Sequence, residues 1–207
     1  MITVHHLENS RSQRVLWMLE ELGLPYAIKR YERNKKTMLA PPELRQVHPL
    51  GKSPVIDDDG LVIAETGAIV EYLVEKADGR LGPPSHRDSA LRYRFWLHYA
   101  EGSMMPPLLL KLVLARIPLF GKAALKRIQP MIDVHLDYIE SELAQRPWFA
   151  GDEMTAADVM MSFPLEAARS RGGLDASRPA TVAWLDKVHA RPAYKTALAK
   201  GGPYSYA

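Results

Sequence analysis

Small polar side chains occupy residues 9–12, where a predicted strand meets the first predicted helix. These side chains are Asn9, Ser10 and Ser12. A helix N-terminus carries unpaired N–H groups and the positive end of the helix dipole, so it attracts an anion. A hydroxyl group at this place can donate to that anion, or it can cap the helix by accepting a backbone N–H. The spacing alone supports both interpretations.

A second loop, Gly51-Lys52-Ser53-Pro54, has the composition of a peptide-binding edge. The residue before a proline is held in extended geometry, so Ser53 can present its backbone N–H and C=O along an open edge. A peptide ligand can pair with such an edge as a short extra strand. A cis Ser53–Pro54 bond would aim the edge outward, although only about 5–6% of X–Pro bonds are cis. The alternative is an ordinary turn.

The third loop combines an acidic side chain with a predicted helix start at Glu65-Thr66. Thr66 and the amides that follow it could hold a carboxylate at the helix N-terminus, while Glu65 could pair with an ammonium group. Together the two residues would bind the zwitterionic end of an amino acid. The alternative is an ordinary N-cap at Thr66 beside a surface glutamate.

The elements that must position these loops follow from the apolar spacing of residues 1–77. Residues 2–7 and 26–32 predict two strands, and the apolar stripe in residues 15–22 predicts a helix between them that ends at Gly23. Such a unit has parallel strands. A short helix near residues 41–45, two strands joined by an Asp-Gly turn near residues 53–64, and a helix from Thr66 complete the order β-α-β-α-β-β-α.

The rest of the chain predicts a separate all-helical domain. Residues 78–87 contain two glycines and two prolines, which is typical of a linker. Residues 88–207 show helical spacing, clearest over residues 128–143, and Thr155 with Asp158 forms a capping-box pattern. We therefore expect an α/β domain at 1–77, a linker at 78–87 and an all-α domain at 88–207.

The composition excludes several classes of chemistry. The 207 residues include no cysteine, so a thiol that takes part in the reaction must arrive with a substrate. The net charge is +3 with the basic residues spread along the chain, so we expect no nucleic-acid partner. The histidine spacings do not match a metal motif, so we expect no metal. No apolar run is long enough to span a membrane and no basic leader precedes one, so we expect a cytoplasmic protein without a membrane partner.

Nearly the whole chain resembles the glutathione transferase family. Residues 48–56 resemble the family segment that carries a cis proline, and Glu65-Thr66 with the apolar positions after it resembles its γ-glutamyl-binding signature. Residues 155–158 match the capping box and buried aspartate of its second domain, and residues 191–194 resemble its closing helix. The resemblance implies a thioredoxin-like N-terminal domain followed by the all-helical C-terminal domain.

The resemblance also implies roles for five residues in binding glutathione. Glu65 and Thr66 would hold the γ-glutamyl end. Ser53 would pair with the cysteinyl backbone, Pro54 would set that geometry, and Lys52 would lie near the peptide. Ser53 replaces the usual valine, but the family uses the backbone of that residue, so the contact is expected to remain.

The catalytic position implied by the resemblance lies in the first loop. The spacing of Ser10 and Arg14 matches that of theta-like, serine-type members, which makes Ser10 the leading candidate to donate a hydrogen bond to the glutathione thiolate. Asn9 and Ser12 remain alternatives. The thiolate would attack a small apolar electrophile, for which Met104, Met105, Leu108 and Leu109 are candidate pocket residues unless they belong to the core.

Two functions therefore remain open from the sequence. The first is a detoxifying glutathione transferase, with glutathione as a co-substrate and a homodimer as the assembly that the family implies. The second is a module of the same fold that binds glutathione or a protein partner without catalysis, since a fold does not by itself confer a function.

Overall fold

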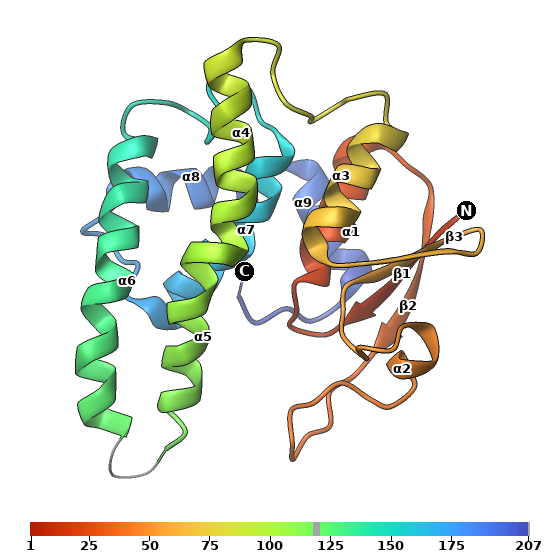
Figure 1. The fold of residues 1–207 in the computed structure, drawn as a ribbon, viewed down its shortest axis with the longest axis horizontal. Coiled ribbons are helices and arrows are strands. Elements are labelled where there is room, and N and C mark those ends of the chain that lie inside the picture. Colours follow the sequence, from red (N-terminus) through yellow and green to blue (C-terminus); the bar gives the residue numbers. More distant parts are fainter. Residues whose placement is uncertain (118–120, 207) are drawn as a thin grey trace. The chain divides into compact units, whose positions relative to one another are not determined.

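The computed structural model describes residues 1–117 and 121–206, which form two compact units. The first unit contains residues 1–82 and 189–205, and the second contains residues 83–188 and Tyr206. The first boundary, between Gly82 and Pro83, falls inside the segment predicted as a linker. Residues 189–205 pack with the first unit, although the sequence placed them in the helical domain at 88–207. Figure 1 shows the elements of each unit.

A four-stranded sheet with helices forms the first unit. The elements in chain order are β1 (Ile2–Leu7), α1 (Ser12–Leu22), β2 (Tyr26–Tyr31), α2 (Leu44–Val47), β3 (Val55–Asp58), β4 (Leu61–Ala64) and α3 (Thr66–Lys76). The strand order is β2-β1-β3-β4, with β1 and β2 parallel and β3 antiparallel to both of its neighbours. The predicted element order and the thioredoxin-like fold class are confirmed.

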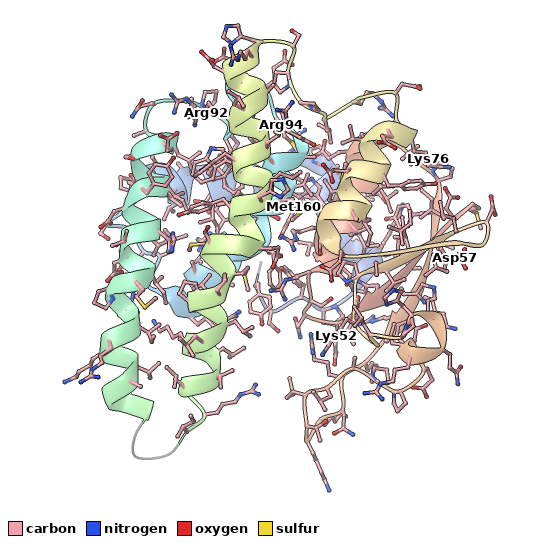
Figure 2. The ribbon with its side chains drawn as sticks, in the orientation of Figure 1. Lys52, Asp57, Lys76, Arg92, Arg94 and Met160 are labelled. Carbon is pink, nitrogen blue, oxygen red and sulfur yellow. The ribbon has the colours of Figure 1, made fainter. Side chains whose placement is uncertain are left out.

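The helices α1 and α3 pack on the sheet, and the carboxylate of Asp58 holds α3 there. Both helices contact each other and the sheet, and Figure 1 shows them side by side. Asp58, at the end of β3, accepts a hydrogen bond from the Tyr72 hydroxyl at 2.6 Å and pairs with Lys76 Nζ at 2.6 Å. Lys76 lies at the C-terminal end of α3 (Figure 2). These two contacts tie the C-terminal half of α3 to the end of β3.

The helix α9 (Pro192–Gly201) completes the first unit by packing on α1. Its Tyr194 is buried and meets Trp17 of α1 edge to face, with 5.5 Å between ring centroids. Arg191 donates to Glu21 Oε2 at 2.8 Å. A helix with a buried apolar stripe joins the unit that covers that stripe, so its sequence position does not decide its domain.

The second unit is built from helices, which confirms the all-α prediction. They are α4 (Arg87–Tyr99), η1 (Ala100–Met104), α5 (Met105–Leu114), α6 (Gly121–Leu143), α7 (Ala156–Ala167), η2 (Ala168–Gly172) and α8 (Pro179–His189). Every residue of α7 is buried. Met104, Met105 and Leu108 also belong to the core, while Leu109 is 49% exposed. None of the helices in the described part of the chain is long and apolar enough to cross a membrane.

Asp158 organises the start of α7 as a capping box. Its Oδ2 accepts the Thr155 N–H at 2.8 Å and the Thr155 hydroxyl at 3.1 Å, and its Oδ1 accepts the Phe149 N–H at 3.0 Å. The side chain is fully buried, and this burial raises the pKa of Asp158 to about 6 against the opposing effect of the hydrogen bonds. The carboxyl group therefore links the preceding loop to α7.

We expect Asp158→Ala to lower the free energy of unfolding by about 2–4 kcal/mol, because it removes a helix cap and leaves buried N–H donors without an acceptor. Urea unfolding followed by circular dichroism measures the change. The matched control is Asp152→Ala, since Asp152 is exposed in the same loop. Equal effects of the two substitutions would contradict this account of the capping box.

Candidate functional site

A buried chain of hydrogen bonds lies beneath the loop between β1 and α1. Ser10 Oγ and Ser12 Oγ are 2.7 Å apart, and Ser12 Oγ is 2.8 Å from His6 Nδ1. Ser10 Oγ also accepts the Ser12 N–H at 3.2 Å, but the N-cap of α1 is Arg11, which forms no capping hydrogen bond with its side chain, so the interpretation of a serine as the N-cap is wrong. Ser12 has no exposed surface and Ser10 is 5% exposed, whereas Asn9 is half-buried.

His6 forms the inner end of this chain as a neutral ring. Burial, together with the nearby Arg30, lowers the pKa of His6 to about 4, although a hydrogen bond to the Gly201 backbone opposes this shift. At neutral pH the imidazole therefore carries one proton. His6 was not predicted as a site residue, because the sequence analysis tested the histidines only for the spacing of a metal motif.

Asn9 is held by the C-terminal segment of the first unit. Its backbone adopts a left-handed conformation with φ 49°, which asparagine tolerates better than most residues. The side-chain Oδ1 accepts the backbone N–H of Ser205 at 2.7 Å. Arg33 donates to the carbonyl oxygens of Glu8 at 3.2 Å and Asn9 at 3.4 Å. These contacts fix both the backbone and the side chain of Asn9.

The second loop contains a cis Ser53–Pro54 bond, as the resemblance implied. Ser53 Oγ donates to the carbonyl oxygen of His5 at 2.8 Å and accepts the N–H of Leu7 at 3.3 Å. The hydroxyl group thus attaches the loop to β1. Within residues 1–117 and 121–206, Ser53 forms no backbone–backbone hydrogen bond, so this short edge stays open. Lys52 is exposed in the loop before β3 (Figure 2).

The helix α3 begins one residue earlier than the sequence predicted. Glu65 takes the N-cap position, and Thr66 is the first helical residue, so the prediction of Thr66 as the N-cap was wrong. Glu65 has φ 73° and forms no capping hydrogen bond with its side chain. A non-glycine residue in this region costs about 1–3 kcal/mol, and such residues cluster at ligand sites. The first N–H groups of α3 therefore remain available for an anion.

The register of the sheet brings the three loops together. His5 pairs with Val55 in the β1–β3 ladder, and Val55 pairs with Ala64 in the β3–β4 ladder. The C-terminal end of β1, the N-terminal end of β3 and the C-terminal end of β4 therefore lie at the same end of the sheet (Figure 1). The loop after β1, the cis-proline loop and the start of α3 all continue from that end. The arrangement combines the open backbone of Ser53 with two helix N-termini, and such groups can pair with a peptide backbone and attract an anion.

Comparison with known proteins identifies the family. A family model described as "Glutathione S-transferase, N-terminal domain" matches residues 10–76, and one described as "Glutathione S-transferase, C-terminal domain" matches residues 104–192. The chain belongs to the glutathione S-transferase family, as its sequence motifs indicated.

Three similar proteins illustrate the range of the family. Glutathione S-transferase 3 of Schizosaccharomyces pombe is 39% identical, with 97% of this chain and 88% of the relative covered. FtsZ-localized protein A of Caulobacter vibrioides is 30% identical, with 97% and 92% covered. The crystal structure of a glutathione S-transferase from Actinobacillus pleuropneumoniae is 34% identical, with a TM-score of 0.88 over 100% of this chain and 95% of that one.

We expect His6 to make stability depend on pH between about 6.5 and 4. In this range the unfolded chain binds a proton that the folded ring does not, so the free energy of unfolding falls as the pH is lowered. The contribution of His6 is on the order of 3 kcal/mol.

Urea unfolding at a series of pH values measures this dependence. His6→Gln should flatten the acid slope, while His98→Gln, which changes an exposed histidine, should leave it as in the wild type. An unaltered slope in His6→Gln would show that the buried ring does not exclude the proton.

Proposed function

We propose that the protein is a glutathione transferase. It binds glutathione at the three loops of the first unit, stabilises the thiolate, and transfers the tripeptide to a small apolar electrophile. One observation supports the proposal above all, in a chain of this family. The backbone of Ser53, which forms no backbone–backbone hydrogen bond in the described residues, lies at the same end of the sheet as the start of α3, which has no side-chain cap. No metal takes part in the proposed reaction.

The binding roles follow the chemistry of each loop. The γ-glutamyl carboxylate would accept hydrogen bonds from the Thr66 hydroxyl and the first amides of α3, and the exposed carboxylate of Glu65 would pair with the ammonium group. The cysteinyl backbone would pair with the N–H and C=O of Ser53, which Pro54 holds at that end of the sheet. Lys52 would contribute a positive charge near the peptide.

The thiolate must be stabilised by the loop at residues 9–12. A free thiol has a pKa of about 8.5, and lowering it by about two units requires roughly 2.7 kcal/mol. A hydrogen bond to a charged group contributes about 1.5–3 kcal/mol, so one donor with the helix dipole is sufficient. Ser10 and Asn9 are the candidates for direct contact, whereas the fully buried Ser12 would act through Ser10.

The assembly we propose is a cytoplasmic homodimer. The edge strand β4 exposes Leu61 and Val62, and α4 exposes Leu91 and Phe95. Exposed apolar side chains on an edge strand and on helices are typical of surfaces that a partner covers. A second copy of the chain is the partner that the family implies.

A second candidate function is a glutathione-binding or protein-interaction module without catalysis. The 30% identity to a protein named FtsZ-localized protein A favours keeping this candidate. One assay distinguishes the two functions: it measures the rate at which glutathione and an activated aryl chloride form a thioether. The transferase requires turnover above the uncatalysed rate, and glutathione binding without turnover would favour the module.

We expect Glu65→Ala to weaken glutathione binding by about 10- to 100-fold, because a charge-assisted contact of about 1.5–3 kcal/mol is lost. Isothermal titration calorimetry measures the dissociation constant. Glu75→Ala is the matched control, since Glu75 is exposed on the same helix. If the wild type failed to bind glutathione at millimolar concentration, the proposed function would be rejected.

A further inference from the structure

The direction of each hydrogen bond beneath Ser10 follows from the state of His6. The Nε2 side of the ring faces Gly201, whose backbone carbonyl accepts a hydrogen bond from the ring, so Nε2 carries the proton. A neutral ring has one N–H, and Nδ1 is therefore an acceptor. The partner at 2.8 Å from Nδ1 is Ser12 Oγ, which must donate.

Ser10 is consequently committed as a donor to Ser12. A hydroxyl has one hydrogen, and that of Ser12 has two acceptors within reach, His6 Nδ1 at 2.8 Å and the Leu7 carbonyl oxygen at 3.2 Å, so it is not available to Ser10. The 2.7 Å contact between Ser10 Oγ and Ser12 Oγ can therefore be a hydrogen bond only if Ser10 donates. Turning the Ser10 hydrogen toward a sulfur anion would leave two oxygens in contact without a proton. Burial of Ser12 and His6 excludes water from repairing this loss.

The side chain of Asn9, unlike the hydroxyl of Ser10, keeps a donor group that no contact inside the described part of the chain uses. A backbone N–H can only donate, so the Ser205 N–H identifies the accepting atom of the Asn9 amide as oxygen. This contact fixes the amide plane and leaves the two Nδ2 hydrogens for another acceptor. Within the described part of the chain, Asn9 Nδ2 has no hydrogen-bond partner. Asn9 is also more exposed than Ser10 or Ser12.

We propose that Asn9 donates the hydrogen bond that stabilises the glutathione thiolate, and that the C-terminal segment positions Asn9 through the backbone N–H of Ser205. The inference rests on the proposed function and names its donor. The thiol proton leaves to solvent, Asn9 stays neutral, and no other bond forms or breaks in this step. Ser10 and Ser12 then hold the loop, and Ser205 acts only through Asn9.

The test measures the thiol pKa of bound glutathione from the ultraviolet absorbance of the thiolate. The variants are Asn9→Gly, which tolerates the left-handed backbone, Ser205→Pro, which lacks the N–H, and Ser10→Ala. Ser205→Ala keeps the N–H and is the matched control. Circular dichroism and the urea midpoint of each variant establish that it is folded.

We expect Asn9→Gly and Ser205→Pro to raise the thiol pKa toward the free value of about 8.5, and Ser10→Ala and Ser205→Ala to leave it low. A rise of one unit, from about 6.5 to about 7.5, reduces the thiolate fraction at pH 6.5, and with it kcat/KM, about fivefold. At a pH well below the pKa of the bound thiol, the binding constant of glutathione should change little, because there the sulfur is protonated and Asn9 contacts only the sulfur; at higher pH binding should weaken along with the loss of thiolate.

Each contrary result has a distinct meaning. A raised pKa in Ser10→Ala with a low pKa in Asn9→Gly would overturn the assignment and make Ser10 the donor. A low pKa in Ser205→Pro with a raised pKa in Asn9→Gly would overturn the role of the C-terminal segment. Wild-type protein that does not bind glutathione would overturn the proposed function itself, whereas the first two results leave glutathione binding intact.

Discussion

The pairing register of the central sheet is the constraint on which the site depends. His5, Val55 and Ala64 are neighbours across three strands, so the segments that leave those strands must begin at one end of the sheet. A shift of one residue in the β1–β3 ladder would move the cis-proline loop along β1 and break the contacts of Ser53 Oγ with the backbone of β1. The proximity of the cis-proline loop and the two helix N-termini is thus a consequence of strand pairing.

Hydrogen bonds with a fixed direction then divide the polar groups at this end of the sheet into two sets. One set, which includes the hydroxyl groups of Ser12 and Ser53, forms hydrogen bonds that attach the loops to β1. The other set consists of groups that have no hydrogen-bond partner among the residues that the structure describes, such as the backbone of Ser53 and the first amides of α3. Backbone groups left open at this place can bind a ligand, and they are the ones that the proposed function uses.

The C-terminal helix links this end of the sheet to the end of the chain. α9 packs so closely on α1 that a Cβ on Gly201 would lie 2.8 Å from Gln13 Oε1 and 2.9 Å from Leu16 Cδ1. The same approach brings the Gly201 carbonyl to His6, and the residues that follow α9 bring Ser205 to Asn9. The first unit is therefore completed by residues that are far away in sequence from the loop they support.

Local patterns were sufficient to determine the order of the elements, the all-helical second half, the capping box at Thr155 and Asp158, and the absence of a protein thiol. These features depend on periodicity, composition and residues a few positions apart. The tertiary structure alone decided that residues 189–205 join the first unit, that Glu65 and not Thr66 is the N-cap of α3, and that His6 sets the direction of the serine hydrogen bonds. The physical reason is that a contact such as that of Asn9 with Ser205 depends on how distant helices pack against each other. The spacing of residues within one helix or strand does not predict such packing.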